Sequence, residues 1–219
     1  MFRNKLDEES SKLHDDLVKL GAMSEAAIGS SIEALMTKNI DLALTVVEHD
    51  KDVNNLTSVI ESEALKILLK RHPVASDFRM ISCALKIVSN IERIADQAQD
   101  IASITVNLKN EDYITKLGKI PRMADISKKM LKLCIDSFVG LDVKLAEEVL
   151  ALDDELDNLF LQTKGDMVKL ISNDPKYADV AIYLMMIAKY FEKIGDHAEN
   201  IAEWVIFEKT GERKNFRLL

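Results

Sequence analysis

Two rows of acidic and amide side chains, placed a hundred residues apart, are the part of this sequence best suited to chemistry. The first row is Glu92, Asp96 and Asp100, and its copy is Glu192, Asp196 and Asn200. Residues four apart lie on one face of a helix, so each row presents its oxygen atoms on a single side. Like charges at this spacing destabilise a helix by about 0.2–0.5 kcal/mol per pair, so the rows need something that offsets the repulsion.

In the first half of the chain, a second row lies level with the first one. Residues equally distant from the turn of a helical hairpin lie beside each other. Asp96 is as far after Pro73 as Asp50 is before it, and Asn54 matches Glu92 in the same way. The hairpin around Pro73 should therefore bring Asp50 and Asn54 next to the acidic row.

The second half repeats this arrangement around Pro175. Asp153 is level with Asp196 to within one residue, and Asp157 is level with Glu192 to the same precision. Here all four positions are carboxylic acids, whereas the first half has an amide at Asn54. The second set is therefore the more complete of the two.

Several carboxyl groups at one level repel one another unless a cation joins them, protons neutralise some of them, or they point into water. Oxygen ligands without cysteine suit Mg²⁺, Ca²⁺, Mn²⁺ and iron, and carboxylates can bridge several ions. The sequence therefore predicts a carboxylate metal site in each half, with scope for a multinuclear one. The alternative is a solvated acidic face, because the chain has 37 Asp and Glu, and Arg93 and Lys193 stand three residues before Asp96 and Asp196.

Other potential ligands are less well placed. His197 follows Asp196 but is rotated by about 100° from the acidic row, so coordination by it is the less favoured interpretation. Cys83 and Cys134 stand among apolar neighbours without a CxxC pattern, which favours reduced, buried thiols. Neither cysteine is assigned any chemistry.

The composition describes an acidic, globular protein. The net charge of -8 and a pI near 5.1 argue against nucleic-acid binding, which needs clustered Lys and Arg. The charged beginning of the chain lacks the apolar stretch of a secretory signal, so a cytoplasmic location is expected. The longest apolar run, residues 180–188, is about half of the roughly 20 residues that a spanning helix needs, so no transmembrane segment is expected.

The elements that must position the acidic rows are helices. Only seven Gly and three Pro occur, and apolar residues recur at spacings of three and four. Asp41 and Asp142 are suited to cap the helices that follow them. The predicted helices span residues 5–38, 41–70, 76–108, 118–140, 142–172 and 176–208. Because the second three repeat the first three, we predict an all-α fold of two tandem three-helix bundles, residues 1–109 and 121–219, joined by a linker at 110–120.

The repeated ExxxD rows, the DxxxD row at Asp153 and Asp157 with its degenerate copy at Asp50 and Asn54, and the segment PVASDFR at 73–79 together resemble the PhoU family of phosphate-signalling regulators. The resemblance covers nearly the whole chain. It implies a cytoplasmic homodimer that restrains phosphate uptake and starvation signalling. The implied partners are the ATPase component of the phosphate ABC transporter and, in many bacteria, a sensor histidine kinase, with membrane association only through such partners.

The resemblance also implies multinuclear iron or zinc clusters, with Mg, Mn and Ca left open. Their ligands would be Asp50, Glu92, Asp96, Asp153, Asp157, Glu192 and Asp196. Asn54 departs from the family pattern and puts the first-half site in doubt, while Asp100 and Asn200 are outer additions.

Two rival functions stay open at this point. A di-iron carboxylate enzyme would use Glu-x-x-His motifs, and the sequence has none. A metal-free helical adaptor would share the regulatory role without binding an ion. We therefore expect a regulator and not an enzyme.

Overall fold

The computed structural model describes residues 2–71, 73–213 and 216–217 and consists almost entirely of long helices. The first half contains α1 (Phe2–Thr37), α2 (Ile40–Arg71) and α3 (Ala75–Asn107), and the second contains α4 (Ile120–Gly140), α5 (Val143–Asn173) and α6 (Ala178–Thr210). The predicted helix boundaries are confirmed to within three residues. Two-residue strands, β1 (Glu212–Arg213) and β2 (Phe216–Arg217), form a small antiparallel pair that the helical pattern does not reveal.

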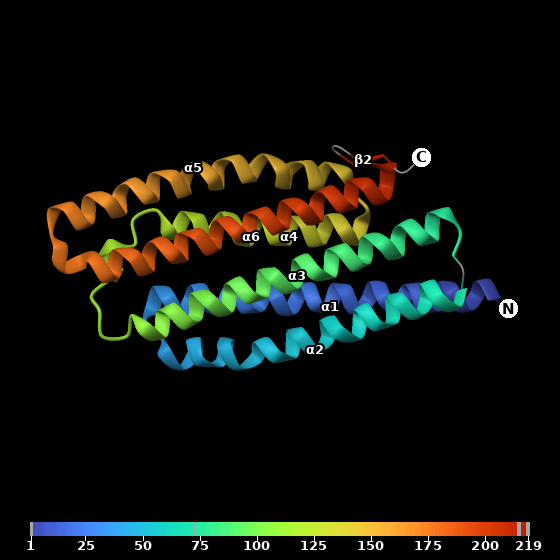
Figure 1. Cartoon of the computed structure of the whole chain (residues 1–219), viewed down its shortest axis with the longest axis horizontal. Coiled ribbons are helices and arrows are strands. Elements are labelled where there is room, and N and C mark those ends of the chain that lie inside the picture. The colour runs from blue at the N-terminus through green and yellow to red at the C-terminus, as the bar shows by residue number, and fades with distance from the viewer. Residues whose placement is uncertain (1, 72, 214–215, 218–219) are drawn as a thin grey trace.

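The two bundles lie side by side along the long axis of the molecule (Figure 1). Helices α1, α2 and α3 pack together, as do α4, α5 and α6, and α3 packs against α6 between the bundles. The α2–α3 turn and the α5–α6 turn point to opposite ends (Figure 1). One continuous apolar core runs through both bundles, and includes Ile87, Ile91 and Ile94 of α3 with Ile187, Phe191 and Ile194 of α6.

Matching hydrogen bonds show that the repeat is structural. The hydroxyl of Ser24 on α1 donates to the carbonyl of Ile91 on α3, at 3.4 Å. The hydroxyl of Ser127 on α4 donates to the carbonyl of Phe191 on α6, at 3.2 Å. Both serines are fully buried. The second half therefore repeats the packing of the first, with an offset of 103 residues for α1 and α4 and of 100 for α3 and α6.

The same offset corrects one prediction about helix caps. Asp142 does cap α5, because its carboxylate accepts from the backbone nitrogens of Lys144 and Leu145. Asp41, however, lies inside the first turn of α2, and the cap is Asn39, whose side-chain oxygen accepts from the nitrogen of Leu42 at 3.0 Å. Asn39 precedes Asp142 by 103 residues, so the two caps are the true repeat partners.

The segment between the bundles is packed onto the core. It contains a short 3-10 helix, η1 (Ile114–Lys116), and its side chains Tyr113 and Leu117 are buried. The Tyr113 hydroxyl donates to the carbonyl of Leu35 at 2.7 Å, which ties the segment to the end of α1. Within the described part of the chain, no helix has the length and apolar character needed to cross a membrane.

Candidate metal centre

The second half brings three predicted carboxylates together. Asp153 and Asp157 project from α5 and Asp196 projects from α6, and one oxygen of each lies within 4.8 Å of the other two. Asp153 is half-buried, whereas Asp157 is exposed. This is the separation at which one cation could contact all three side chains, so the predicted pairing across the hairpin places them correctly.

Burial and mutual repulsion raise the pKa values in this cluster. The pKa of Asp153 rises to about 7, mainly because burial removes water from the carboxylate, and secondly because Glu199, Asp157 and Asp196 are close. The pKa of Asp157 is also raised, by burial and then by Glu192 and Asp196. Glu199 was not predicted, although its position three residues after Asp196 on the same helix could have suggested it.

A glycine lets α5 and α6 approach each other at this cluster. A Cβ on Gly195 would lie 2.5 Å from Leu156 Cδ2 and 3.0 Å from Asp153 Oδ1. A side chain there would force Leu156, Asp153 or the helices to move. Gly195 therefore lets α5 and α6 pack closely beside the Asp153 and Asp196 carboxylates.

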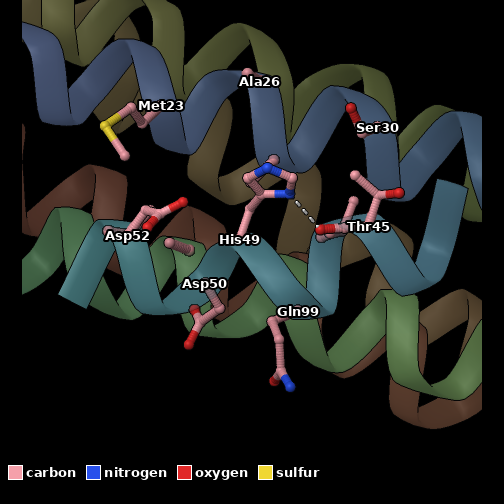
Figure 2. Close-up of a pocket in the computed structure, with 12 residues that line it drawn as sticks. Met23, Ala26, Ser30, Thr45, His49, Asp50, Asp52 and Gln99 are labelled. Atoms are coloured by element: carbon pink, nitrogen blue, oxygen red, sulfur yellow. Dashed lines mark hydrogen bonds between the residues drawn. The ribbon is translucent and has the colours of Figure 1, made fainter. Parts of the chain in front are cut away.

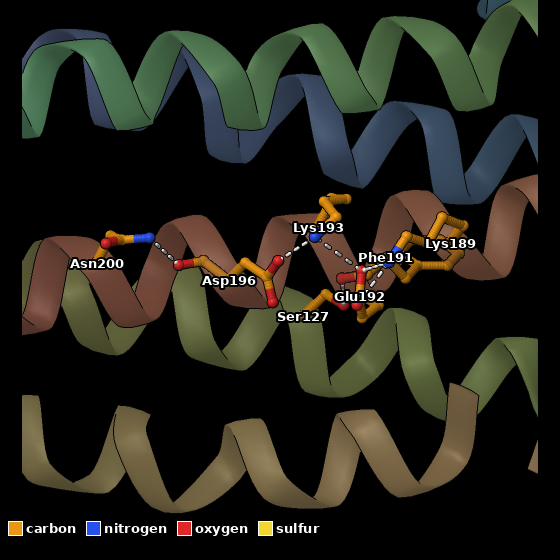
Figure 3. A network of polar contacts seen from close by, with 7 residues as sticks. All are labelled: Ser127, Lys189, Phe191, Glu192, Lys193, Asp196 and Asn200. Carbon is orange, nitrogen blue, oxygen red and sulfur yellow. Dashed lines mark hydrogen bonds and ion pairs between the residues drawn. The ribbon is translucent and has the colours of Figure 1, made fainter. Parts of the chain in front are cut away.

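Lysines pair with the α6 carboxylates (Figure 3). The ammonium of Lys189 donates to both oxygens of Glu192, at 2.7 Å each, and Lys193 pairs with Asp196 and more weakly with Glu192. These pairs supply part of the charge compensation that the acidic rows need. Among the described residues, no ion pair is made to Asp153 or Asp157 on α5.

The first-half cluster contains fewer charges. Asn54 donates from its amide nitrogen to Asp50 Oδ2 at 2.8 Å, while Asp50 Oδ1 and Asn54 Oδ1 are buried without a partner among the described residues. The pKa of Asp50 is raised by burial and by the charge of Asp96. Arg93 donates to Asp96 at 2.9 Å. The two orphaned oxygens fit a cation, but only one of them belongs to a carboxylate.

Glu92 belongs to the same cluster, since burial and the charges of Asp96, Glu61 and Asp50 all raise its pKa.

A cavity of about 230 Å³ lies beside Asp50, between α1, α2 and α3, and is lined by Val53 and Ala95 (Figure 2). The first site therefore borders a cavity within its own bundle.

The outer positions differ between the halves. Burial raises the pKa of Asp100, Asp96 and Asp50 raise it further, and a hydrogen bond with Tyr190 of α6 lowers it. Asp100 thus lies near the first cluster and also contacts the other bundle. Asn200 instead donates to the backbone carbonyl of Asp196 at 2.8 Å.

His197 connects the two bundles. Its Nδ1 lies 3.0 Å from Asn90 Oδ1 on α3, and burial lowers its pKa. The buried cysteines are free thiols, as predicted, and burial raises the pKa of Cys134.

The fold and its sites define a class of protein made of two repeat-related helical bundles, each with a carboxylate cluster between its second and third helices. The model of the PhoU domain matches this chain twice, over residues 17–105 and 120–205. The chain therefore belongs to the PhoU family.

Relatives match over nearly their full length. A "phosphate-specific transport system accessory protein PhoU homolog" of Zymomonas mobilis is 35% identical over 94% of this chain and 87% of its own. The homolog of the same name from Aquifex aeolicus is 33% identical over 95% and 94%. The crystal structure of PhoU from Pseudomonas aeruginosa is similar with a TM-score of 0.90 and 28% identity, covering 94% of this chain and 99% of that one.

Proposed function

We propose that this protein is a cytoplasmic accessory regulator of phosphate transport that restrains phosphate uptake and the response to phosphate starvation. The observation that carries the proposal is the full-length match to accessory proteins of phosphate-specific transport systems. The proposed partners are the ATPase component of the phosphate ABC transporter and a sensor histidine kinase, and the proposed assembly is a homodimer. Contact with these partners, and not catalysis, is the proposed mode of action.

The regulatory proposal is tested by deleting the coding sequence in the source organism. Phosphate uptake and phosphate-regulated expression should rise when phosphate is abundant, and re-expression of the intact chain should restore repression. A deletion strain with a normal phosphate response would reject the proposal. Pull-down of the transporter ATPase from the same cells addresses the partner separately.

We also propose that the second-half carboxylates hold a metal, iron or zinc being the expected ion. Asp153, Asp157 and Asp196 fit a cation because their oxygens converge within 4.8 Å and the α5 pair lacks an ion-pair partner among the described residues. Glu192 would join them once Lys189 releases it. A bound metal would supply positive charge between the carboxylates of α5 and α6, close to Gly195. Without the metal, Lys189 and Lys193 supply part of that positive charge.

Metal analysis of protein purified without chelator tests this site. The variant Asp153→Asn with Asp196→Asn should lose the second-half metal, because two of the three converging carboxylates are replaced by amides of the same size. Glu148→Gln, an exposed change on α5, is the matched control and should keep the metal. Unchanged metal content in the double variant would show that these carboxylates do not hold the metal.

The first-half site should bind metal more weakly, because Asn54 stands where the second half has Asp157. The variant Asn54→Asp should raise the metal content per chain by filling the first site. No increase on the substitution would contradict the prediction that Asn54 leaves the first site incompletely filled.

A metal-free adaptor is the second candidate function. It is favoured by the ion pairs of Lys189 and Lys193, which already offset much of the repulsion along α6. The Asn double variant separates the two: a strain carrying it would lose repression if the metal is needed for signalling, and would keep repression if the bundle acts alone.

A further inference from the structure

A cavity at one end of the molecule carries polar groups that the proposed function does not use. It measures about 360 Å³ and is lined by the N-terminal part of α1, the start of α3 and the ends of α4 and α6. These segments meet at the end of the molecule where the α2–α3 turn lies (Figure 1). Small-molecule sites typically measure about 300–1,000 Å³, and an engineered apolar cavity of roughly 150 Å³ holds benzene. The cavity can therefore accept a ring with a short chain.

Two buried oxygens in this cavity have no hydrogen-bond partner among the described residues. They are the hydroxyl oxygen of Ser10 on α1 and Oε2 of Glu208 on α6. Apolar side chains, Leu13, Leu17, Met80, Ala84 and Phe138 among them, form most of the remaining wall. Both residues line the cavity, and buried polar atoms are normally paired, so two orphaned oxygens on residues of one cavity point to a missing partner.

The internal repeat allows the end of the molecule with the cavity to be compared with the equivalent end of the other bundle. Glu208 and Ala84 correspond to Leu108 and Leu184 in the other repeat, at the offset of 100 that relates α3 to α6. Both leucines are fully buried, and at that end the inter-bundle segment adds the buried side chains of Tyr113 and Leu117. The same architecture is therefore closed with apolar groups at one end, whereas the other end is hollow and contains a carboxyl group.

The charges around the cavity favour a cationic ligand. Two carboxyl groups, Asp7 and Glu208, line it, together with the imidazole of His14, whose ring stacks on Phe138 with centroids 4.8 Å apart. Among the described side chains, Arg79 of α3 is a cation that acts on the charge of Glu208. Its guanidinium lies over Gly211, where a Cβ would be 2.6 Å from Nη1, and it forms no ion pair with Glu208 among the described contacts.

We propose that this cavity, here named the Glu208 cavity, binds a small amphipathic amine. The ammonium would donate to Glu208 Oε2 and to the Ser10 hydroxyl oxygen, which are acceptors left without a partner. Its apolar body would lie against Leu13, Leu17 and Phe138. A primary ammonium offers three hydrogens, enough for both oxygens and one further acceptor such as Asp7 or water.

Phenethylamine is the probe, and the methyl resonance of Met80, which lines the cavity, is the readout in methionine-labelled full-length protein. The Met80 signal should shift and saturate with a dissociation constant of about 1 mM, the affinity expected for a ligand of this size. The neutral isostere 2-phenylethanol and the anion phenylacetate should bind at least tenfold more weakly, because neither carries the ammonium. Equal binding of the alcohol would overturn the assignment of an amine.

Two variants locate the binding site. Ala84→Leu copies the closed end of the molecule and should weaken phenethylamine binding at least tenfold by filling the cavity. Glu208→Gln keeps the shape of the side chain and removes its charge, so it should weaken binding by a similar factor. It tests the site independently of Ala84→Leu, whose larger side chain could disturb folding. Glu148→Gln, on the exposed face of α5, changes the net charge by the same amount and should bind normally. Unweakened binding by Glu208→Gln, or no shift of Met80 in the unmodified protein, would reject the proposal.

Discussion

At the scale of single residues, the two halves solve one packing problem in complementary ways. Gly195 faces Leu156 at the second carboxylate cluster, and the corresponding pair in the first half is Ala95 with Val53. All of these positions are buried. In the second half, the smaller residue on the third helix is matched by the larger residue on the second helix. The spacing of these two helices therefore depends on the combined volume of the two side chains.

The variant Gly195→Ala should lower the free energy of unfolding. Alanine improves helix propensity by about 1 kcal/mol, but overpacking against the buried Leu156 costs about 1–3 kcal/mol, so we expect a net loss of up to about 2 kcal/mol. Leu156→Val alone should cost about 1 kcal/mol by leaving a small cavity. The double variant copies the first half and should be more stable than the sum of the two losses predicts, by about 1 kcal/mol in urea unfolding. Additive losses would contradict this coupling.

Glu208 should make stability depend on pH. Burial raises the pKa of Glu208 from 4.5 to about 7, so between these values the unfolded chain has lost a proton that the folded chain keeps. Stability due to this group therefore falls as pH rises from 4.5 to 7 and is constant above. The free energy of unfolding of Glu208→Gln, measured relative to that of the unmodified protein, should therefore be about 2 kcal/mol higher at pH 8 than at pH 4.5, after allowance for solvent screening.

Unfolding in urea at several pH values measures this gain. Asp7 and His14 of α1 line the same cavity as Glu208, and Arg79 of α3 acts on its charge. All three are present in both proteins, so the difference isolates Glu208. The exposed control Glu148→Gln should show no such difference. A gain that is the same at pH 4.5 and pH 8 would show that the Glu208 carboxyl does not titrate in this range.

At the scale of helices, the caps make a sharp prediction. Asn39→Ala and Asp142→Ala should each cost about 1 kcal/mol, because each removes a side-chain acceptor for the first backbone N–H groups of a helix. Asp41→Ala should cost no more than about 0.5 kcal/mol, since Asp41 lies within the first turn and contributes only through the helix dipole. Thermal unfolding of the three variants compares them directly. A larger loss for Asp41 than for Asn39 would contradict the observed cap.

Helix-level features were predictable because they are local. Apolar spacing located all six helices, and equal distance from Pro73 and Pro175 was enough to pair Asp50 with Asp96 and Asp153 with Asp196. The cap of α2 was misassigned because Asn39 and Asp41 are both good capping residues and only the backbone hydrogen bond distinguishes them. The lysine pairs of Glu192 could be suspected from spacing, but their formation depends on side-chain conformation.

Contacts between the bundles were not predictable, because nothing in the local pattern indicates which helix of one bundle meets the other. The meeting of α3 and α6 brings Asn90 to His197 and Tyr190 to Asp100, and it encloses Glu208 beneath α1 and α4. In the sequence, Glu208 looks like any other carboxylate near the end of a helix. Its burial follows only from the packing of four helices that are distant in sequence.

At the scale of the whole molecule, the continuous core across α3 and α6 predicts that both halves unfold together. Helix α3 packs on α1, α2 and α6 at once, so removing the second bundle would expose much of its buried surface. Neither bundle should then be stable without the other. The enthalpy measured by calorimetry should equal the van't Hoff enthalpy, as it does for a single cooperative transition.

The two cysteines allow the halves to be followed separately. Cys83 is buried in α3 and Cys134 is buried in α4, so each thiol becomes reactive only when its own bundle opens. In increasing urea, both thiols should become reactive at the same concentration, coincident with the fluorescence change of Trp204, which is the sole tryptophan. Coincidence would show that the contact between α3 and α6 couples the unfolding of the two bundles. A change at one carboxylate cluster would then alter the stability of the bundle that contains the other. Labelling of Cys83 at clearly lower urea than Cys134 would mean instead that the halves are independent and that their two clusters act separately.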